Sequence, residues 1–553
     1  MHSRTPRYPA SQETRVYPAA ALSVVSSLAV KHSGFNLHHA NSMSRRKEIY
    51  YEPLRKLSNS TVDITHCATP RRFRWIEVAA LIDFHLRIVE SDKPSIGDIA
   101  YATISYVWKG KAHACAPDCL ETFHVVGAME GADIDPISID LLRTAAFAAR
   151  DLGAEYLWLD RLCIMQAVRD DKDWQIMNMG DIYRACRTCL IFPGGLQRLV
   201  VLEEETNWIL RAWTLQEAVA PPSANCVFRF DREQLEYTMS SGNSQVFTIE
   251  KGRSARMPIF YMLIASVMGK IDQRCEGDPK VRSYPVSIFR GNATADLLVN
   301  ALMGIFHCDD DVDAREDFIW RSALLRTSKR PIDMVFSTMA LFGVKLDPAR
   351  YRTREAATIG LAQAILAKGG RANWILASAT NTLPTPQFPN ACTVDSAGHR
   401  TADGKFVELD SAFGVQINVV MSDAPGGVLD DSGTLTVVLP MARVRAAMTA
   451  EGVGSVEFLD SEGRAAGADS EILFTGTTPG THAVIVGTQR VINIMSCMSI
   501  PTDTVVILVE KCSHDSGLWH MTGRAEIIRS TLEHCFKEAE VRLAHVCGSG
   551  QSQ

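Results

Sequence analysis

Three short apolar segments that alternate with helical patterns constrain the fold of this chain most strongly. Residues 101–108 are β-branched and aromatic, and residues 156–160 and 188–192 are apolar enough to be buried on both faces. Residues 135–153 and 171–184, which lie between these segments, carry apolar residues at helical spacing. Strand, helix and strand at this spacing form a βαβ unit, so we expect a parallel sheet covered by helices. Any ligand is then expected outside the carboxyl ends of the strands.

The length of 553 residues exceeds what a single hydrophobic core supports, so several domains are expected. We predict a poorly specified leader over residues 1–70, with a short helix near 44–57, and an α/β domain over 71–235. An α-helical middle domain over 236–380 and a linker over 381–404 follow. A small β-rich domain of the sandwich or barrel type takes up residues 405–553 and ends in a helix over 531–545.

Composition and charge exclude some classes of partner. Hydrophobic residues make up 46% and charged residues 22%, as in ordinary globular proteins. The net charge of −6 favours neither nucleic acid nor an anionic membrane surface, and no apolar run is long enough to predict a membrane span. The 14 cysteines are scattered, several inside apolar runs, which favours a reducing, cytoplasmic location. Residues 18–30 resemble a targeting segment only weakly, so a disordered tail is favoured.

Cysteine and histidine spacing gives little support to a metal site. His113, Cys115, Cys119 and His124 offer four ligand types within one loop, but no second knuckle accompanies them, so we predict reduced thiols and no metal. The pair of cysteines at 186 and 189 leads into an apolar strand, which favours core residues over a redox motif. The sequence also lacks a nucleophile elbow, a Walker A motif and an H-E-x-x-H motif.

The remaining candidate for chemistry is a carboxylate near the end of the α/β segment. Residues 208–220 have the apolar periodicity of a helix. Trp213 and Glu217 are four residues apart and therefore share one helical face, where the indole ring can reduce the access of water to the acid. The alternative is that Glu217 is an ordinary solvated residue, as most helical glutamates are. We expect Tyr106 and Trp108 to provide aromatic walls near this helix.

The motifs of this segment resemble a known family. Residues 104–108, 156–166, 173–174, 179–183 and 211–217 are similar, in order, to the successive motifs of the fungal heterokaryon-incompatibility (HET) domain, over about residues 98–222. Residues 330–343 are also similar to the segment that comes directly after the domain in many members. One departure is Met177, where many members carry a glutamate three residues after the tryptophan that corresponds to Trp174.

HET domains in turn resemble TIR domains, some of which cleave NAD. In such enzymes the essential glutamate lies on the helix after the third strand, which corresponds here to Glu217 and leaves the departure at Met177 without effect on the site. The resemblance implies that Glu217 stabilises the oxocarbenium-like state formed when the nicotinamide–ribose bond breaks. The residues implied in binding the nucleotide are Tyr106, Trp108, Lys109, Asp160, Arg161 and Trp213. Of these, Trp108 or Trp213 would stack on a flat ring, and Lys109 or Arg161 would meet the pyrophosphate.

The resemblance therefore implies a role in nonself recognition, programmed cell death and innate immunity in a fungus, with NAD as substrate and no required cofactor. The alternative function is a non-enzymatic signalling module that triggers cell death by self-association or by binding a partner protein. A homo-oligomer or a protein partner in an incompatibility or defence pathway fits that alternative, and fold alone does not decide between the two.

Overall fold

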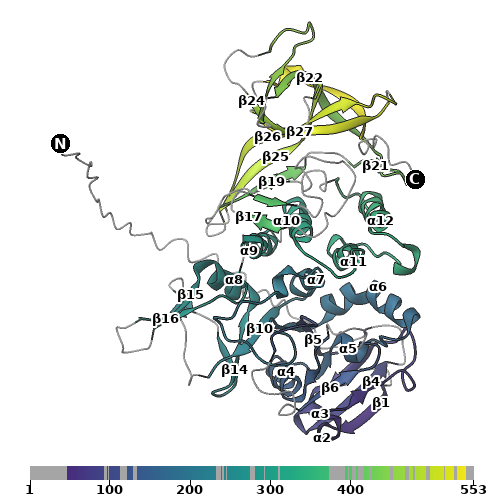
Figure 1. Cartoon of the computed structure of the whole chain (residues 1–553), viewed down its shortest axis with the longest axis vertical. Helices are drawn as coiled ribbons and strands as arrows, with labels where there is room; N and C mark the ends of the chain where they lie inside the picture. The colour runs from purple at the N-terminus through teal and green to yellow at the C-terminus, as the bar shows by residue number, and fades with distance from the viewer. Residues whose placement is uncertain are drawn as a thin grey trace, which may run out of the picture.

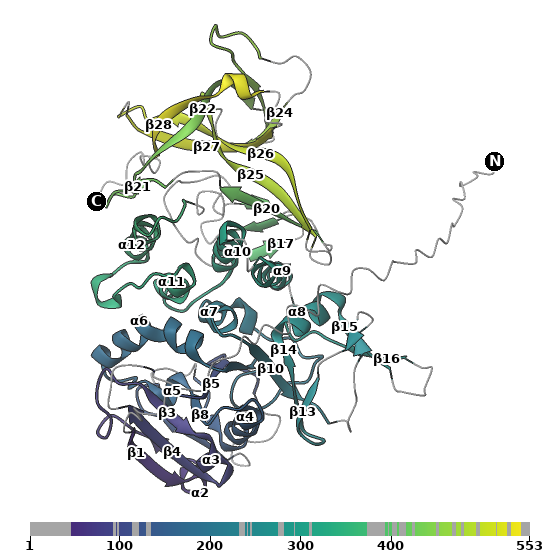
Figure 2. The same ribbon diagram turned by 180° about the vertical axis from the view of Figure 1, so that it is seen from behind.

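A computed structural model gives the architecture of the chain. It describes residues 46–543, apart from parts of 92–98 and 232–245, all of 113–120, 129–133, 275–280, 292, 309–311 and 373–392, and several short stretches between 396 and 531. An α/β part, a layer of helices and a β-rich part lie one above another along the long axis (Figure 1). The view from behind shows the same order, with the helices between the two sheets (Figure 2).

A mixed sheet of nine strands forms the α/β part. Its strand order is β1 (Arg46–Pro53), β4 (His85–Ser91), β3 (Arg74–Glu77), β8 (Tyr156–Trp158), β5 (Tyr101–Tyr106), β9 (Thr188–Phe192), β10 (Ala224–Arg229), β14 (Ser254–Pro258) and β13 (Phe247–Glu250). The four central strands, β8, β5, β9 and β10, are parallel. The strands on both flanks pair antiparallel. The expected parallel sheet is therefore correct only at the centre, and the whole sheet is mixed.

The edge strand β1 corrects the predicted leader. Residues 46–53, expected to form part of a helix within a poorly specified segment, pair along their length with β4. Because β1 lies at the edge and buries only Ile49 fully, its sequence carries no clear alternation of apolar and polar residues. Only the following Leu54–Leu57 forms a helical turn, α2. A small separate sheet joins β2 (Thr61–Val62), β6 (Thr122–Val125) and β7 (Ile137–Ser138).

The helices of the α/β part follow the predicted periodicity. They are α3 (Val78–Ile82), α4 (Ile139–Asp151), α5 (Asp160–Cys163), α6 (Arg169–Ala185) and α7 (Trp213–Val219). Gly153 follows α4 with a φ of 75°, which confirms the expected glycine at the helix end. The helix predicted over 208–220 is interrupted, because a 3-10 turn, η3 (Trp208–Leu210), precedes α7. At the break, the amide of Ala212 donates to the carbonyl of Thr327, and the amide of Thr327 donates to the carbonyl of Leu210.

The helical layer covers α7 and one side of α6. It contains α8 (Ile259–Met268), α9 (Ala293–His307), α10 (Val312–Leu325), α11 (Asp333–Met339) and α12 (Arg354–Ala367), with the short turns η4 (Ala340–Phe342) and η5 (Pro348–Arg350). Gly180 of α6 lies so close to η4 that a Cβ there would be 2.0 Å from the Cβ of Ala340, so this packing requires a glycine. The hairpin β15 (Lys270–Arg274) and β16 (Val281–Pro285) was not expected in a helical domain. No described helix is long and apolar enough to cross a bilayer.

A second nine-stranded sheet forms most of the C-terminal part. Its strands are β20 (Gln416–Ser422), β21 (Val428–Leu429), β22 (Leu435–Met448), β23 (Val453–Phe458), β24 (Ile472–Gly476), β25 (His482–Asn493), β26 (Met498–Lys511), β27 (Trp519–Ile527) and β28 (Lys537–Leu543). The sheet closes on itself because β22 also pairs with β25. Smaller pieces of this part are β17 (Thr393–Asp395), β18 (Gly398–Arg400), β19 (Phe406–Glu408) and η6 (Glu533–Cys535). The short strands β11 (Thr238–Met239) and β12 (Gly242–Asn243) form a separate pair, and β11 contacts β15.

The helix predicted to close the chain over 531–545 is wrong. After the short turn η6, residues 537–543 form β28, which pairs antiparallel with β22. Val541 and Leu543 are buried while Arg542 between them is exposed, so the segment has the two-residue period of a strand. The predicted linker over 381–389 lies outside the described residues.

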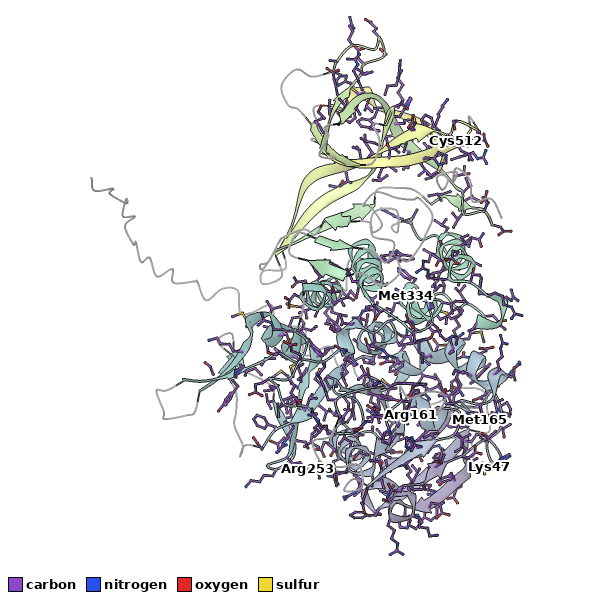
Figure 3. All side chains as sticks on the ribbon, viewed as in Figure 1. Lys47, Arg161, Met165, Arg253, Met334 and Cys512 are labelled. Carbon is purple, nitrogen blue, oxygen red and sulfur yellow. The ribbon has the colours of Figure 1, made fainter. Side chains whose placement is uncertain are left out.

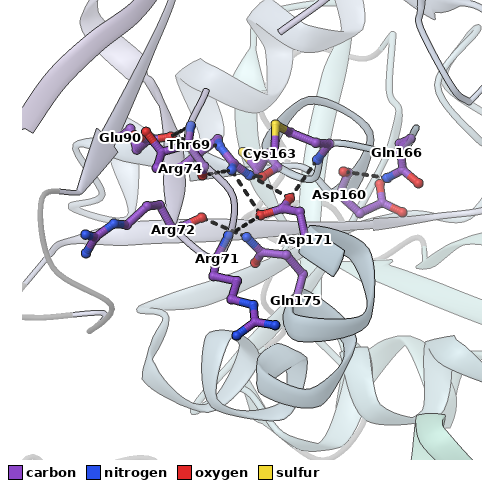
Figure 4. A network of polar contacts seen from close by, with 11 residues as sticks. Thr69, Arg71, Arg72, Arg74, Glu90, Asp160, Cys163, Gln166, Asp171 and Gln175 are labelled. Carbon is purple, nitrogen blue, oxygen red and sulfur yellow. Dashed lines mark hydrogen bonds and ion pairs between the residues drawn. The ribbon is translucent and has the colours of Figure 1, made fainter. Parts of the chain in front are cut away.

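A buried ion network ties the flank of the sheet to α6 (Figure 4). Arg74 of β3 is fully buried and donates to both carboxylate oxygens of Asp171 at 3.0 Å. Its Nε donates to Glu90 of β4 at 3.3 Å, and its remaining donors meet the carbonyls of Cys163 and Thr69. Asp171 also accepts the amides of Met165 and Arg71, so both charges are closely satisfied.

We predict that Arg74→Met lowers the free energy of unfolding by about 3–5 kcal/mol, because it leaves Asp171 as a buried charge without its partner. The midpoint of urea unfolding followed by tryptophan fluorescence measures this change. Arg87→Met is the matched control, since Arg87 pairs with Glu48 and Glu77 but keeps 38% of its side chain exposed, and it should cost about 1 kcal/mol or less. Equal losses in the two variants would contradict this account.

Candidate active site

The carboxyl group of Glu217 lies against the centre of the parallel strands. The hydroxyl of Ser105, near the end of β5, donates to Glu217 Oε2 at 2.5 Å. Trp208 of η3 donates its indole N–H to the same Ser105 oxygen at 2.8 Å, and the Tyr183 side chain of α6 hydrogen-bonds to the carboxyl. Burial raises the pKa of Glu217 from 4.5 to about 8, against the opposing effect of the Ser105 hydrogen bond. Glu217 is therefore largely a neutral acid at pH 7.

A second acid, Asp160, follows the neighbouring strand β8. Tyr106 donates its hydroxyl to Asp160 Oδ1 at 2.7 Å, and Trp108 donates its indole N–H to Oδ2 at 3.0 Å. The amide of Arg161 is a third donor, at 2.7 Å from Oδ1. Burial raises the pKa of Asp160, and these donors oppose the rise because they stabilise the ionised form. The backbone is held as well, since Gln166 donates to the carbonyl of Asp160 at 2.9 Å (Figure 4).

The two acids influence each other electrostatically. After burial and the Ser105 hydrogen bond, the charge on Asp160 is the next cause of the Glu217 pKa shift, and it raises the pKa further. Glu217 loses water and accepts a hydroxyl donor, whereas Asp160 accepts three donors. Two acids in such different environments divide naturally into a proton-bearing group and an ionised group.

The structure brings together some of the residues predicted from the sequence. Tyr106, Trp108 and Asp160 form one hydrogen-bonded group, and the charge on Asp160 raises the pKa of Glu217. The aromatic residues therefore contact the aspartate directly and not the glutamate.

Three other predicted residues have different surroundings. The side chain of Arg161 is almost fully buried (Figure 3) and donates to the carbonyl of Asp135 at 2.7 Å, so it is engaged with backbone. Lys109 is exposed at the start of a turn. Trp213 hydrogen-bonds to Asp333 of α11, so its polar edge is directed to the helical layer. Their roles in binding a nucleotide remain predictions.

Sequence reasoning missed the residues that hold Glu217 in place. Ser105 was noted only as part of a motif, Trp208 only as part of an apolar stripe, and Tyr183 only as a motif position. A signal was available for Ser105, because a small polar residue inside a buried strand must find a hydrogen-bond partner. Nothing in the local pattern indicates which helix supplies that partner.

Arg326, from the turn after α10, fixes the start of α7. It is fully buried and donates to Thr214 Oγ1 at 2.7 Å and to the carbonyl of Arg211 at 2.9 Å. Burial lowers its pKa to about 9, and the nearby Glu217 opposes that shift. The helical layer thus contributes directly to the geometry of α7, so the α/β segment does not hold Glu217 alone.

The candidate metal ligands are only partly described. His113, Cys115 and Cys119 lie outside the described residues, and His124 lies in β6. Within the part of the chain that the structure describes, no group of three or more potential ligands comes together. Cys186 and Cys189 are free and buried, which confirms the interpretation as core residues, and burial raises the pKa of Cys186 to about 12.

We predict that Glu217→Gln changes how stability depends on pH. A carboxyl whose pKa is raised on folding favours the folded state below about pH 4.5, and that contribution is lost as pH rises towards about 8. The wild type should therefore lose stability across this window relative to Glu217→Gln. Melting temperatures of both proteins between pH 5 and pH 9 measure the difference, which should widen with pH. Parallel curves would show that Glu217 ionises at an ordinary pKa.

Comparison with known proteins identifies one domain. The family model of the heterokaryon incompatibility protein (HET) matches residues 101–203, which span β5 to the segment after β9. Neither a curated protein sequence nor a solved structure matches the chain, so the TIR-like resemblance gains no support from a structural neighbour. The matched segment contains Ser105, Asp160 and Tyr183 and ends before Glu217. The chain therefore carries a HET domain over these residues, the domain of the heterokaryon incompatibility protein family.

Proposed function

We propose that this protein hydrolyses the nicotinamide–ribose bond of NAD or a related nucleotide, with Glu217 as the catalytic residue, and that this reaction serves heterokaryon incompatibility and cell death. The observation that carries the proposal is the pair of acids beside the ends of β5 and β8. In its ionised form Glu217, whose pKa is raised to about 8, supplies a charge with little water around it, which suits the oxocarbenium-like state at a glycosidic carbon, and Asp160 is a second acid held in place by three donors.

The reaction needs little besides charge and position. Loss of nicotinamide leaves a positively charged, oxocarbenium-like ribose, and water adds to it to give ADP-ribose, nicotinamide and a proton. A carboxylate beside the ribose stabilises that charge and accepts a hydrogen bond from a ribose hydroxyl. The ionised form of Glu217 fills this role, and Ser105 and Tyr183 hold the carboxyl in position. Nicotinamide is a good leaving group, so no strong general acid is required.

One observation favours the non-enzymatic alternative. Glu217 is partly buried and its carboxyl is already engaged by Ser105, and α7 packs against α11 and α9 of the helical layer. A module that signals by self-association or by binding a partner protein would use such a carboxyl as a structural group.

We predict that the purified full-length protein releases nicotinamide from NAD and that Glu217→Gln lowers kcat at least about 100-fold. The substitution removes the negative charge that stabilises the positive charge developing on ribose in the transition state. Release of nicotinamide, separated by liquid chromatography, is the measurement. Glu203→Gln is the matched control, because Glu203 is an exposed carboxyl in the segment before η3. This variant should keep full activity. Full-length protein is needed because Arg326 holds α7.

An inactive wild type, assayed both as monomer and at concentrations that promote assembly, would refute the enzymatic proposal. Equal activity in wild type and Glu217→Gln would refute the assignment of Glu217. The first result would leave assembly or partner binding as the function of the domain, and the second would place catalysis on another residue.

We also predict the direction of the pH profile. Because the ionised form of Glu217 is the active one, kcat/KM should rise with pH up to about 8 and then level off. Initial rates between pH 6 and pH 9.5 at low NAD concentration measure this. A rate that falls over the same range would mean that the protonated form of Glu217 is the active one.

A further inference from the structure

A cavity of about 1220 Å³ lies away from the two acids, beside the first turns of α4. Arg55 of α2 and the α3–β4 turn with Phe84 contribute one part of its lining. Arg143 of α4 contributes a second part, and the segment around Arg198, together with Arg229 and Arg253, contributes the third. Figure 3 labels Arg253 low on the molecule, far from the helical layer. The volume matches or exceeds that of ordinary small-molecule sites.

The cavity carries excess positive charge in a chain whose net charge is −6. Five arginines and three acids line it, and two of these acids are already in ion pairs. Glu204 accepts hydrogen bonds from both terminal guanidinium nitrogens of Arg198, and Asp140 forms an ion pair with Arg253. Within the described part of the chain, Arg55, Arg143 and Arg229 have no carboxylate partner. The guanidinium groups of these three arginines are therefore available to an anion in the cavity.

The surroundings of the Arg143 side chain favour the binding of an anion. Its guanidinium lies 3.7 Å from the centre of the Phe84 ring, and its buried Nε has no hydrogen-bond partner among the described residues. Phe84 has a φ of 63°, in the left-handed region that favours glycine, and 57% of its surface is exposed. The exposed ring therefore gains little burial, and one of its contacts is with the Arg143 guanidinium.

The start of α4 adds the positive end of a helix dipole to the same cavity. Ser138, Ile139 and Asp140 line it, and they are the N-cap and first residues of a 13-residue helix. The amides of Ser138 and Ile139 already donate to the carbonyls of Leu196 and Glu121, so it is the helix dipole that favours an anion at this place. Together with the arginines it suits an anion that carries more than one negative group.

We propose that this cavity binds a small molecule with two or more phosphate groups. Guanidinium groups bind phosphate oxygens in a two-pronged arrangement, and Arg55, Arg143 and Arg229 come from three different elements, so several phosphates are engaged at once. The open face of Phe84 takes a flat ring when the ligand is a nucleotide. A nucleoside triphosphate and an inositol polyphosphate share the phosphate chemistry, and only the nucleotide uses the ring.

Binding by the full-length protein, measured by isothermal titration calorimetry with ATP and separately with inositol hexakisphosphate, tests this proposal. We expect Arg55→Gln and Arg229→Gln each to weaken binding of the bound probe about tenfold, because each removes a charge-assisted contact. Both residues are exposed, so the melting temperature without ligand should stay unchanged. Arg445→Gln, which removes the same charge from an exposed pair in β22, is the control and should bind like wild type.

Tighter binding of ATP, lowered by Phe84→Gly, identifies a nucleotide, and tighter binding of inositol hexakisphosphate identifies a ring-independent polyphosphate. Binding of neither probe overturns the proposal. It is also overturned if Arg445→Gln weakens binding as much as Arg55→Gln, or if an acidic peptide binds where both phosphates fail. The Glu217→Gln variant should bind the probe normally, so failure of the proposed NAD hydrolysis leaves this site intact.

Discussion

The buried guanidinium of Arg74 is the interaction on which the arrangement of the α/β part depends. It is taken fully out of water between β3, β4 and α6, and Asp171 and Glu90 offset the cost of its desolvation. Because Asp171 also accepts the amide of Met165, the network fixes the turn that runs from Asp160 to the start of α6. It therefore places Asp160 at the end of β8 and α6, with Tyr183, beside Glu217. The polar groups of the candidate site rest on a structural ion network that takes no part in chemistry itself.

The helical layer gives the site its second constraint. Arg326 and Thr327 hold the backbone around Arg211 and the start of α7, while Trp213 hydrogen-bonds to Asp333. These contacts fix the start of the helix that carries Glu217, and partial loss of water around the carboxyl is the main cause of its raised pKa. The candidate site thus depends on the helical layer as well as on the segment that matches the HET domain.

The sequence predicts the elements whose pattern is local, and it fails where a distant partner decides. The sequence predicts the strands β5, β8 and β9 from their apolar runs and the helices α4 and α6 from their periodicity. These local patterns are sufficient because burial imposes a pattern on each segment. The sequence does not predict the edge strand β1, because it buries little. The prediction of a helix at β28 is wrong, although Val541 and Leu543 alternate with exposed residues. The break before α7 follows from Thr327, more than 100 residues away, and no local signal marks it.

The candidate site shows the same division. The spacing of Glu217 from Trp213 and the resemblance of the sequence motifs predict Glu217 as the candidate residue. Its hydrogen-bond partner in the structure is Ser105 and not Trp213. That partner follows from the pairing of β5 with its parallel neighbours and from the way α7 lies across them. The sequence does not predict the arginine cavity, because its residues come from eight separate segments and share no spacing.

The central claim is that Glu217 is a partly buried acid that ionises close to neutral pH. Infrared difference spectra between wild type and Glu217→Gln, recorded from pH 4 to pH 10, follow the carbonyl band of a protonated carboxylic acid directly. The account predicts that the band assigned to Glu217 persists at pH 7 and disappears with a midpoint near 8. Disappearance with a midpoint near 4.5, the ordinary value for a glutamate, would contradict it.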